Sequence, residues 1–302
     1  MKLIHKVEEC AVYESNKHSY VSKNSPLNMN HSIKTFLLKI TSSGNPETAT
    51  ALLSNIAKSV RPSAYAYTST SIKCNALQVI PLNTFIEGVH SDSNLELRGM
   101  AYTLTLKLLA DIGTQLEELR SEHDLIIPFL SLEDIIVIQM TRDQKECDKQ
   151  KNKQKDDEQK ECANSGGASA SASESESESE SEYVFVFINA EKLMRQHERR
   201  ESGKSDKREL IVDVPLKVNK HTSFLPAELP ESALKRLPMR LTTTSWYYSL
   251  SALCIYALLK HKFKNGEDDI ERVGRPFLHT SLYFCLKRCL KSDPEERVLL
   301  YV

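Results

Sequence analysis

The sequence has no run of about 18 apolar residues, the length that a helix needs to cross a bilayer. Its first residues, 1–5, also lack the apolar run of a secretory signal peptide. Neither sign of charge is in excess, because 40 lysines and arginines stand against 41 aspartates and glutamates. Composition therefore gives no indication of nucleic-acid binding. We expect a cytoplasmic protein whose partner is neither a membrane nor a nucleic acid.

The sequence also lacks a cysteine framework. Its seven cysteines are scattered, odd in number and without a Cys-x-x-Cys pair, which is typical of reduced thiols rather than disulfides. Cys285 and Cys289 are one helical turn apart, but two ligands do not make a zinc site. We expect these two to pack in the core and the protein to hold no metal.

Periodicity predicts a mixed α+β protein, and 302 residues suffice for one large or two ordinary domains. One helix is predicted after Asn45, which can cap it, with Pro46 in the first turn. A longer helix is predicted over residues 95–120, and a helix that is apolar all round is predicted from Ser245. Runs with β character are predicted as strands, at residues 10–13, 35–40, 64–72, 75–82, 183–188 and 210–218.

Residues 142–182 have a different composition. They mix Lys, Gln, Asp and Glu and then run into Ser-Glu repeats. Such a segment buries too little apolar surface to offset the entropy of ordering it. We expect a disordered insert, and also a charged, mobile segment over residues 195–208.

The C-terminal stretch, residues 224–302, carries the clearest motifs. They are Phe224-Leu225-Pro226-Ala227-Glu228, then Ser245-Trp246-Tyr247-Tyr248-Ser249-Leu250, then Cys289-Leu290-Lys291-Ser292-Asp293-Pro294-Glu295-Glu296-Arg297. This order resembles the C-terminal half of the eukaryotic protein kinase domain, with its Pro-Glu pair, buried helix and closing Cys-Leu-x-x-Asp-Pro-x-x-Arg. Glu228 and Arg297 match the glutamate and arginine that form a buried ion pair in that family, although Ala227 separates Glu228 from Pro226.

The resemblance implies a bilobal kinase-like fold. Residues 1–82 would form a small, β-rich N-lobe and residues 83–302 a larger, mainly helical C-lobe. More narrowly, Tyr247-Tyr248-Ser249-Leu250 and the Leu-Leu-Tyr-Val ending resemble divergent kinase-like proteins of large DNA viruses. That match implies a protein of the host cytoplasm or of the virion.

In the N-lobe the resemblance is partial. Leu38-Lys39-Ile40 is similar to the kinase strand whose lysine holds the phosphates of ATP; the alternative is a strand lysine that faces solvent. The helical glutamate that partners this lysine is missing, because Glu47 lies in the first turn, where it suits the helix N-terminus. Residues 77–82 resemble the hinge that meets adenine. No Gly-x-Gly-x-x-Gly loop precedes Lys39.

In the C-lobe the catalytic positions depart from the family. Phe129 stands where the family has its catalytic aspartate, and a phenyl ring accepts no proton. Asp134 takes the place of the metal-binding asparagine and could hold a cation. Asn189 falls at the aspartate of Asp-Phe-Gly and is a poorer Mg²⁺ ligand, and Lys192 would repel a cation. Trp246 replaces the aspartate that braces the catalytic loop.

These departures imply a pseudokinase that has no phosphotransferase activity, needs no cofactor and acts by binding a partner protein. One alternative is a divergent serine/threonine kinase that binds ATP and Mg²⁺ through Lys39 and Asp134. Another is a structural protein packaged in a virion.

Overall fold

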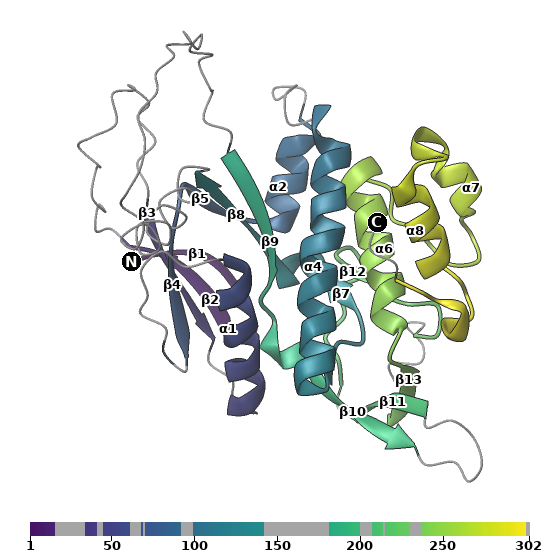
Figure 1. Ribbon diagram of the computed structural model, residues 1–302, viewed down its shortest axis with the longest axis horizontal. Coiled ribbons are helices and arrows are strands. Elements are labelled where there is room, and N and C mark those ends of the chain that lie inside the picture. Colours follow the sequence, from purple (N-terminus) through teal and green to yellow (C-terminus); the bar gives the residue numbers. More distant parts are fainter. Residues whose placement is uncertain are drawn as a thin grey trace, which may run out of the picture.

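The computed structural model describes residues 1–15, 34–40, 45–60, 68, 70–91, 99–141, 181–199, 207–213, 215–229 and 237–299. These residues form six α-helices, short 3₁₀ helices and four small sheets. The α+β class is therefore confirmed. The strands within residues 2–81, 135–141 and 181–187 lie with α1 on one side of the molecule, and the remaining strands lie with the other helices (Figure 1).

The first sheet is antiparallel, with its strands in chain order. It consists of β1 (Lys2–Val7), β2 (Cys10–Glu14), β3 (Lys34–Ile40) and β4 (Ser71–Ala76). Side chains of β3 alternate between the buried face, with Phe36, Leu38 and Ile40, and the outer face. The buried face packs against α1 (Pro46–Val60). Asn45 caps α1 as predicted, since its Oδ1 accepts from the backbone N–H of Glu47 at 3.0 Å.

A second antiparallel sheet has the order β5-β8-β9. Its strands are β5 (Gln78–Pro81), β8 (Ile135–Thr141) and β9 (Ser181–Phe187), and α2 (Leu82–Val89) follows β5 directly. Because β5 lies before residue 82 and β8 after it, this sheet spans the predicted lobe boundary. The predicted disorder of residues 142–180 lies outside the described residues. Its predicted end at residue 182 is wrong, because Ser181 and Glu182 pair with Thr141 and Met140 and extend the ladder.

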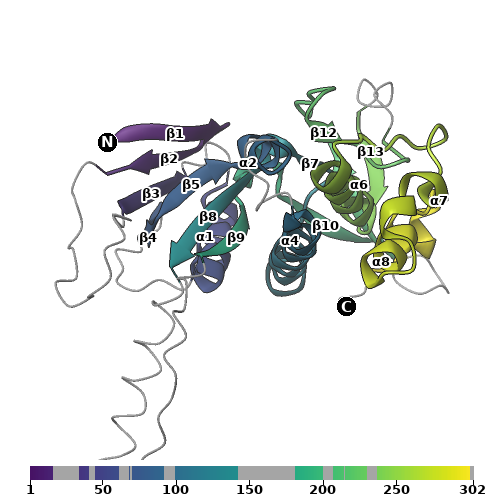
Figure 2. The same ribbon diagram turned by 90° about the horizontal axis from the view of Figure 1, so that it is seen from above.

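The helical side is built around two long helices that pack together, α4 (Ala101–His123) and α6 (Ser245–Leu259). The start predicted for α4, at residues 95–98, lies outside the described residues. Beyond α6 lie α7 (Ile270–Val273), η4 (Arg275–Phe277), α8 (Ser281–Cys289) and η5 (Pro294–Glu296). Figure 2 shows α4 between the first two sheets on one side and α6 and α8 on the other. No described helix is both long and apolar enough to cross a membrane.

The remaining strands form two small antiparallel sheets. One has the order β13-β11-β10-β6, with β6 (Leu125–Ile126), β10 (Met194–Arg199), β11 (Lys207–Val212) and β13 (Met239–Thr242). The other pairs β7 (Leu130–Ser131) with β12 (Ser223–Phe224). The prediction of a mobile segment is wrong for residues 195–199 and 207–208, because these residues pair as β10 and β11. A second, smaller core lies beneath this hairpin, with Ile126, Phe129, Leu210, Val212, Leu229 and Leu241.

Candidate functional site

Four buried polar side chains meet between two 3₁₀ helices, η1 (Leu132–Asp134) and η2 (Ala190–Lys192). They are Ser131, Asp134, Asn189 and Lys192. In η1 the backbone N–H of Ser131 donates to Asp134 Oδ2 at 2.7 Å, as part of a capping box. In η2 Asn189 Oδ1 accepts from the backbone N–H of Glu191 at 3.2 Å. The β8–β9 ladder brings the two 3₁₀ helices together, because it begins at the pair Ile135↔Phe187.

Lys192 supplies the positive charge of this buried cluster. Its Nζ donates to Asp134 Oδ2 at 2.6 Å and to Ser131 Oγ at 2.7 Å. Asn189 Nδ2 donates to the other oxygen, Asp134 Oδ1, at 2.7 Å. The ammonium also lies 4.3 Å from the centroid of the Phe129 ring, a cation–π distance. Both oxygens of Asp134 therefore have protein donors, and a buried carboxylate is matched by a buried ammonium.

Burial governs the ionisable groups around this cluster. It raises the pKa of Asp134, against the lowering effects of the Lys192 ammonium, the Asn189 amide and the Ser131 N–H. It also raises the pKa of the Cys10 thiol to about 12, although a backbone hydrogen bond from Ala190 acts in the opposite direction. Cys10 therefore lies beside η2 as a neutral thiol, without the thiolate character of a nucleophile.

The cluster is poorly suited to a divalent cation. Such an ion prefers hard, anionic oxygen ligands. Asp134 already accepts three hydrogen bonds, and the ammonium bound to it would repel a metal. Asn189 turns its amide nitrogen toward Asp134 and uses its oxygen within η2. Among the described residues, no group of three or more His, Cys, Asp or Glu side chains is placed to hold a metal. The arrangement neutralises charge inside the fold.

Phe129 is part of the smaller core and has no exposed surface. Its ring packs beneath the hairpin of β10 and β11, in one cluster with Leu210 and Val212. A general base must come within hydrogen-bond reach of the proton that it removes. A fully buried phenyl ring has neither an acceptor nor access to a substrate, and its contribution here is packing.

Lys39 lies apart from the buried cluster. It is exposed and faces away from the buried side of β3, where Leu38 and Ile40 lie. It forms no hydrogen bond or ion pair with another described residue. The structure thus brings Asp134 and Asn189 together, whereas Lys39 occupies the outer face of the sheet. Lys39 is therefore a strand lysine that faces solvent.

The segment expected to meet adenine forms β5 and the start of α2. β5 pairs with β8 along its whole length, from Gln78↔Gln139 to Pro81↔Ile136. The Leu77 N–H also donates to the Gln139 carbonyl at 2.8 Å. One edge of this segment is therefore occupied by a neighbouring strand.

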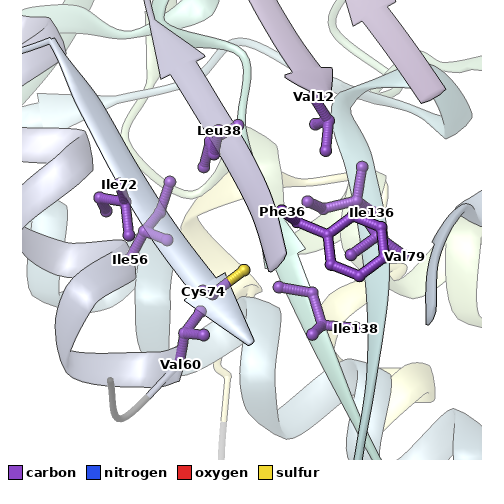
Figure 3. Close-up of a pocket in the computed structure, with 10 residues that line it drawn as sticks. All are labelled: Val12, Phe36, Leu38, Ile56, Val60, Ile72, Cys74, Val79, Ile136 and Ile138. Atoms are coloured by element: carbon purple, nitrogen blue, oxygen red, sulfur yellow. The ribbon is translucent and has the colours of Figure 1, made fainter. Parts of the chain in front are cut away.

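A small apolar cavity lies next to β5, between the first sheet, α1 and β8 (Figure 3). Its lining consists of Val12, Phe36, Leu38, Ile56, Val60, Ile72, Cys74, Val79, Ile136 and Ile138. Ligand sites combine an apolar lining with a few polar groups that orient the ligand. No polar side chain is present here to orient a purine.

β1, which precedes the turn to β2, contacts the chain beside the buried cluster. His5 Nε2 donates to the Glu133 carbonyl, next to Asp134, at 2.8 Å. The turn itself contains Glu8, which has a left-handed φ of 46° and binds Lys217 Nζ at 2.6 Å, and Glu9. Two acidic residues at a turn would repel a phosphate, whereas a glycine loop would cradle it.

Ser249 on α6 is a bracing residue that the sequence analysis missed. Its Oγ accepts from the Leu130 N–H at 2.6 Å and donates to the Phe224 carbonyl at 2.5 Å. It thereby ties α6 to β7 and β12, the two strands that follow Phe129 and precede Glu228. Trp246, the expected bracing position, is buried one turn earlier. The available signal was a serine three residues after Trp246 in an apolar helix, because positions i and i+3 share a face.

Glu228 and Arg297 are in contact. Arg297 Nη1 and Nη2 donate to the two carboxylate oxygens of Glu228, each at 2.7 Å, in a bidentate pair. The Arg297 side chain is fully buried, and its Nε donates to the Lys291 carbonyl at 2.8 Å. Ser245 Oγ completes the site by donating to Glu228 Oε1 at 2.7 Å. The pair joins the segment after β12 to the end of the described chain, and Ser245 adds the start of α6.

Comparison with models of protein families gives no match for this chain, and comparison with curated proteins gives none either.

Proposed function

We propose that this chain is a pseudokinase: a protein of bilobal kinase-like fold that transfers no phosphate and acts by binding a partner protein. The observation that carries the proposal is the buried ion pair between Lys192 Nζ and Asp134 Oδ2, at 2.6 Å. In a kinase with this motif order, the asparagine at the position of Asp134 would face Mg²⁺. Here a side chain of the protein supplies the positive charge.

The order of elements supports the kinase-like fold. A four-stranded sheet with one packed helix comes first, then β5 and the long α4. The β8–β9 hairpin follows the Phe129 region and ends directly before Asn189, and the buried α6 lies near the C-terminal end. The Glu228–Arg297 pair then occupies the positions that the motifs imply.

The absence of phosphotransfer is argued from what the reaction needs. Phosphoryl transfer depends on metal ions that bridge the phosphates, on a positioned base and on a held nucleotide. Lys192 is hydrogen-bonded to Asp134, Phe129 is buried among apolar side chains, and β8 pairs with one edge of β5. A general base alone contributes about 10²–10⁴ in rate, and a metal site contributes electrostatic stabilisation besides. The combined losses leave no route for transfer.

The experiment is transfer of the γ-phosphate of ATP to a generic protein substrate, with Mg²⁺ or Mn²⁺. The unmodified chain is assayed beside Lys39→Ala and Asp134→Ala, with Lys264→Ala as the matched control, an exposed lysine on the helical side. We expect no transfer by any of the four proteins. A thermal-shift measurement with ATP and Mg²⁺ is expected to leave the melting temperature unchanged.

Transfer that survives purification and is lost in Asp134→Ala but kept in Lys264→Ala would overturn the proposal. Transfer that all four proteins share equally would identify a contaminating kinase instead.

A further inference from the structure

The outer face of the first sheet carries three lysines without a counter-charge. Lys6, Lys39 and Lys73 are all exposed, and none forms an ion pair with another described residue. Strand register places them on one face. Lys6 and Lys39 are both partners of Ala11, and Lys73 is the partner of Leu37. Lys6 and Lys39 are therefore two strands apart in one row, roughly 10 Å.

The neighbouring row of this face is apolar or aromatic at three of its four positions. It runs Leu3, Tyr13, Leu37, Lys73 across the four strands. Leu3 is 50% exposed, and Tyr13 and Leu37 are half-buried. No acidic side chain lies on this face within the four described strands. The acidic residue that they contain is Glu14, which lies on the opposite face, in register with Lys2, and binds Lys34 at 2.8 Å. The face thus carries two lysines in one row and a third lysine at the end of the neighbouring row, beside Leu37.

No other described element covers this face. α1 packs against the opposite side, where the apolar cavity lies. Figure 2 shows no helix of the described chain on the outer side of the sheet. Three lysines without a counter-charge on one uncovered face give it a local positive potential, which attracts acidic groups.

We infer that this face, defined by Leu3, Lys6, Tyr13, Leu37, Lys39 and Lys73, binds a short segment of a partner protein in which acidic and aliphatic side chains alternate. The acidic groups would pair with the three lysines, and the aliphatic groups would contact Leu3 and Leu37. Four strands at about 4.8 Å spacing give a face roughly 14 Å across, which suits a peptide segment better than a whole domain. The inference rests on the proposed function only in that the chain acts through a protein partner.

Two other occupants fit the face less well. Sheets that bind single-stranded nucleic acid stack successive bases on several aromatic side chains, and Tyr13 is the one aromatic residue among the described positions of this face. The net charge of −1 gives the chain no general attraction for a polyanion. A second copy docked through the same face would set three lysines against three lysines.

The test uses fluorescence anisotropy with a labelled synthetic peptide in which glutamate alternates with leucine. A matched peptide carries glutamine in place of glutamate. The variant is Lys6→Gln/Lys39→Gln/Lys73→Gln, and the control is Lys260→Gln/Lys264→Gln/Lys291→Gln, which removes the same charge from exposed lysines on the helical side. Equal melting temperatures establish that both triple variants are folded.

We expect the glutamate peptide to bind the unmodified chain and the control with equal affinity, and the first triple variant about tenfold more weakly, since each exposed ion pair contributes modestly. Binding is expected to weaken with salt, with glutamine in the peptide, and with Leu3→Ser. The inference is overturned if the peptide does not bind, if the two triple variants bind it equally, or if only a single-stranded oligonucleotide depends on these lysines. Phosphate transfer would contradict the proposed function and leave this surface unaffected, so the two proposals fail separately.

Discussion

Lys192 Nζ lies 2.6 Å from Asp134 Oδ2, although the two residues are 58 positions apart and neither is open to solvent. Asp134 has no exposed surface, and Lys192 retains 8%. Removing two charges from water costs several kcal/mol per ion, which only good geometry and further hydrogen bonds offset. Ser131 and Asn189 provide those hydrogen bonds. Loss of either charge therefore leaves the other buried without compensation.

The first prediction concerns Lys192→Met, which keeps the length of the side chain and removes its charge. We expect the free energy of unfolding at neutral pH to fall by about 3–5 kcal/mol, the usual cost of breaking a buried pair. Urea denaturation measures it, with Lys264→Met as a control that is expected to change it by less than about 0.5 kcal/mol. A loss below about 1 kcal/mol would show that the cluster does not stabilise the fold.

The second prediction is a pH dependence in the same variant. Burial raises the pKa of Asp134, and Lys192 is the strongest influence that lowers it. Without Lys192 the folded-state pKa rises further above the unfolded value of about 3.9. The folded state then favours the protonated carboxyl of Asp134. The stability that this preference contributes is fully present below the unfolded-state pKa and is lost as pH rises through the folded-state pKa. The deficit of the variant is expected to grow as pH rises above the folded-state pKa of Asp134 in the unmodified chain.

Lys192→Met/Asp134→Asn provides the control for this titration. With no carboxyl in the cluster, its stability relative to the unmodified chain should lack the added slope. An equal slope in the single and double variants would assign the effect to another group.

The third prediction concerns Ser249→Ala. The variant leaves the buried Leu130 N–H without an acceptor and the Phe224 carbonyl without its hydroxyl donor. We expect a loss of about 1–3 kcal/mol in the free energy of unfolding, the cost of a buried unsatisfied group. Ser281→Ala, at an exposed serine on α8, should change it little. Equal effects of the two substitutions would show that Ser249 does not brace the fold.

The fourth prediction concerns Arg297→Lys, which keeps the charge and removes the bidentate geometry. It also removes the hydrogen bonds to the Lys291 and Ser292 carbonyls. We expect a loss of about 2–4 kcal/mol, below the full cost of a broken buried pair because the Glu228 side chain is 19% exposed. Arg288→Lys, on the exposed face of α8, is the matched control. A fully stable Arg297→Lys protein would show that charge alone suffices.

The fifth prediction concerns removal of residues 144–178 and their replacement by a short Gly-Ser linker. Thr141 and Ser181 are paired across the ladder, so a short turn can join the strands. Closure entropy grows only logarithmically with loop length, and we expect the melting temperature to stay within about 2 °C. Loss of cooperative unfolding, followed by circular dichroism, would show that the removed segment packs on the domain.

Local patterns predicted α1, most of α4, α6 and the strands β2, β3 and β9. The strands predicted at 64–72 and 75–82 are wrong in their bounds, because β4 spans Ser71–Ala76 and Leu82 begins α2. The run from Ser245 is apolar all round, and α6 is indeed buried on nearly every side. Period-two alternation in Phe36, Leu38 and Ile40 contained the information that Lys39 faces the other way. A motif comparison that considers Lys39 alone does not use this alternation.

The buried cluster was not predicted, because its members are far apart in sequence. Asn189 and Lys192 bond Asp134 across 55 and 58 positions. The local sequence does not show whether Lys192 lies near a metal and repels it or takes the place of a metal beside Asp134. Ser249 was likewise hidden, since its partner Leu130 lies 119 positions away and offers a backbone N–H.

The β5-β8-β9 sheet has a consequence for how the chain is made. The inner face of the first sheet is completed by Ile136 and Ile138 of β8, which the ribosome adds long after β5. At roughly 5–20 residues per second, on the order of 3–11 s separates synthesis of β5 from that of β8. Throughout this interval Phe36, Leu38 and Ile72 lack part of their cover. The nascent first third of the chain thereby exposes apolar surface of the kind that is prone to aggregate.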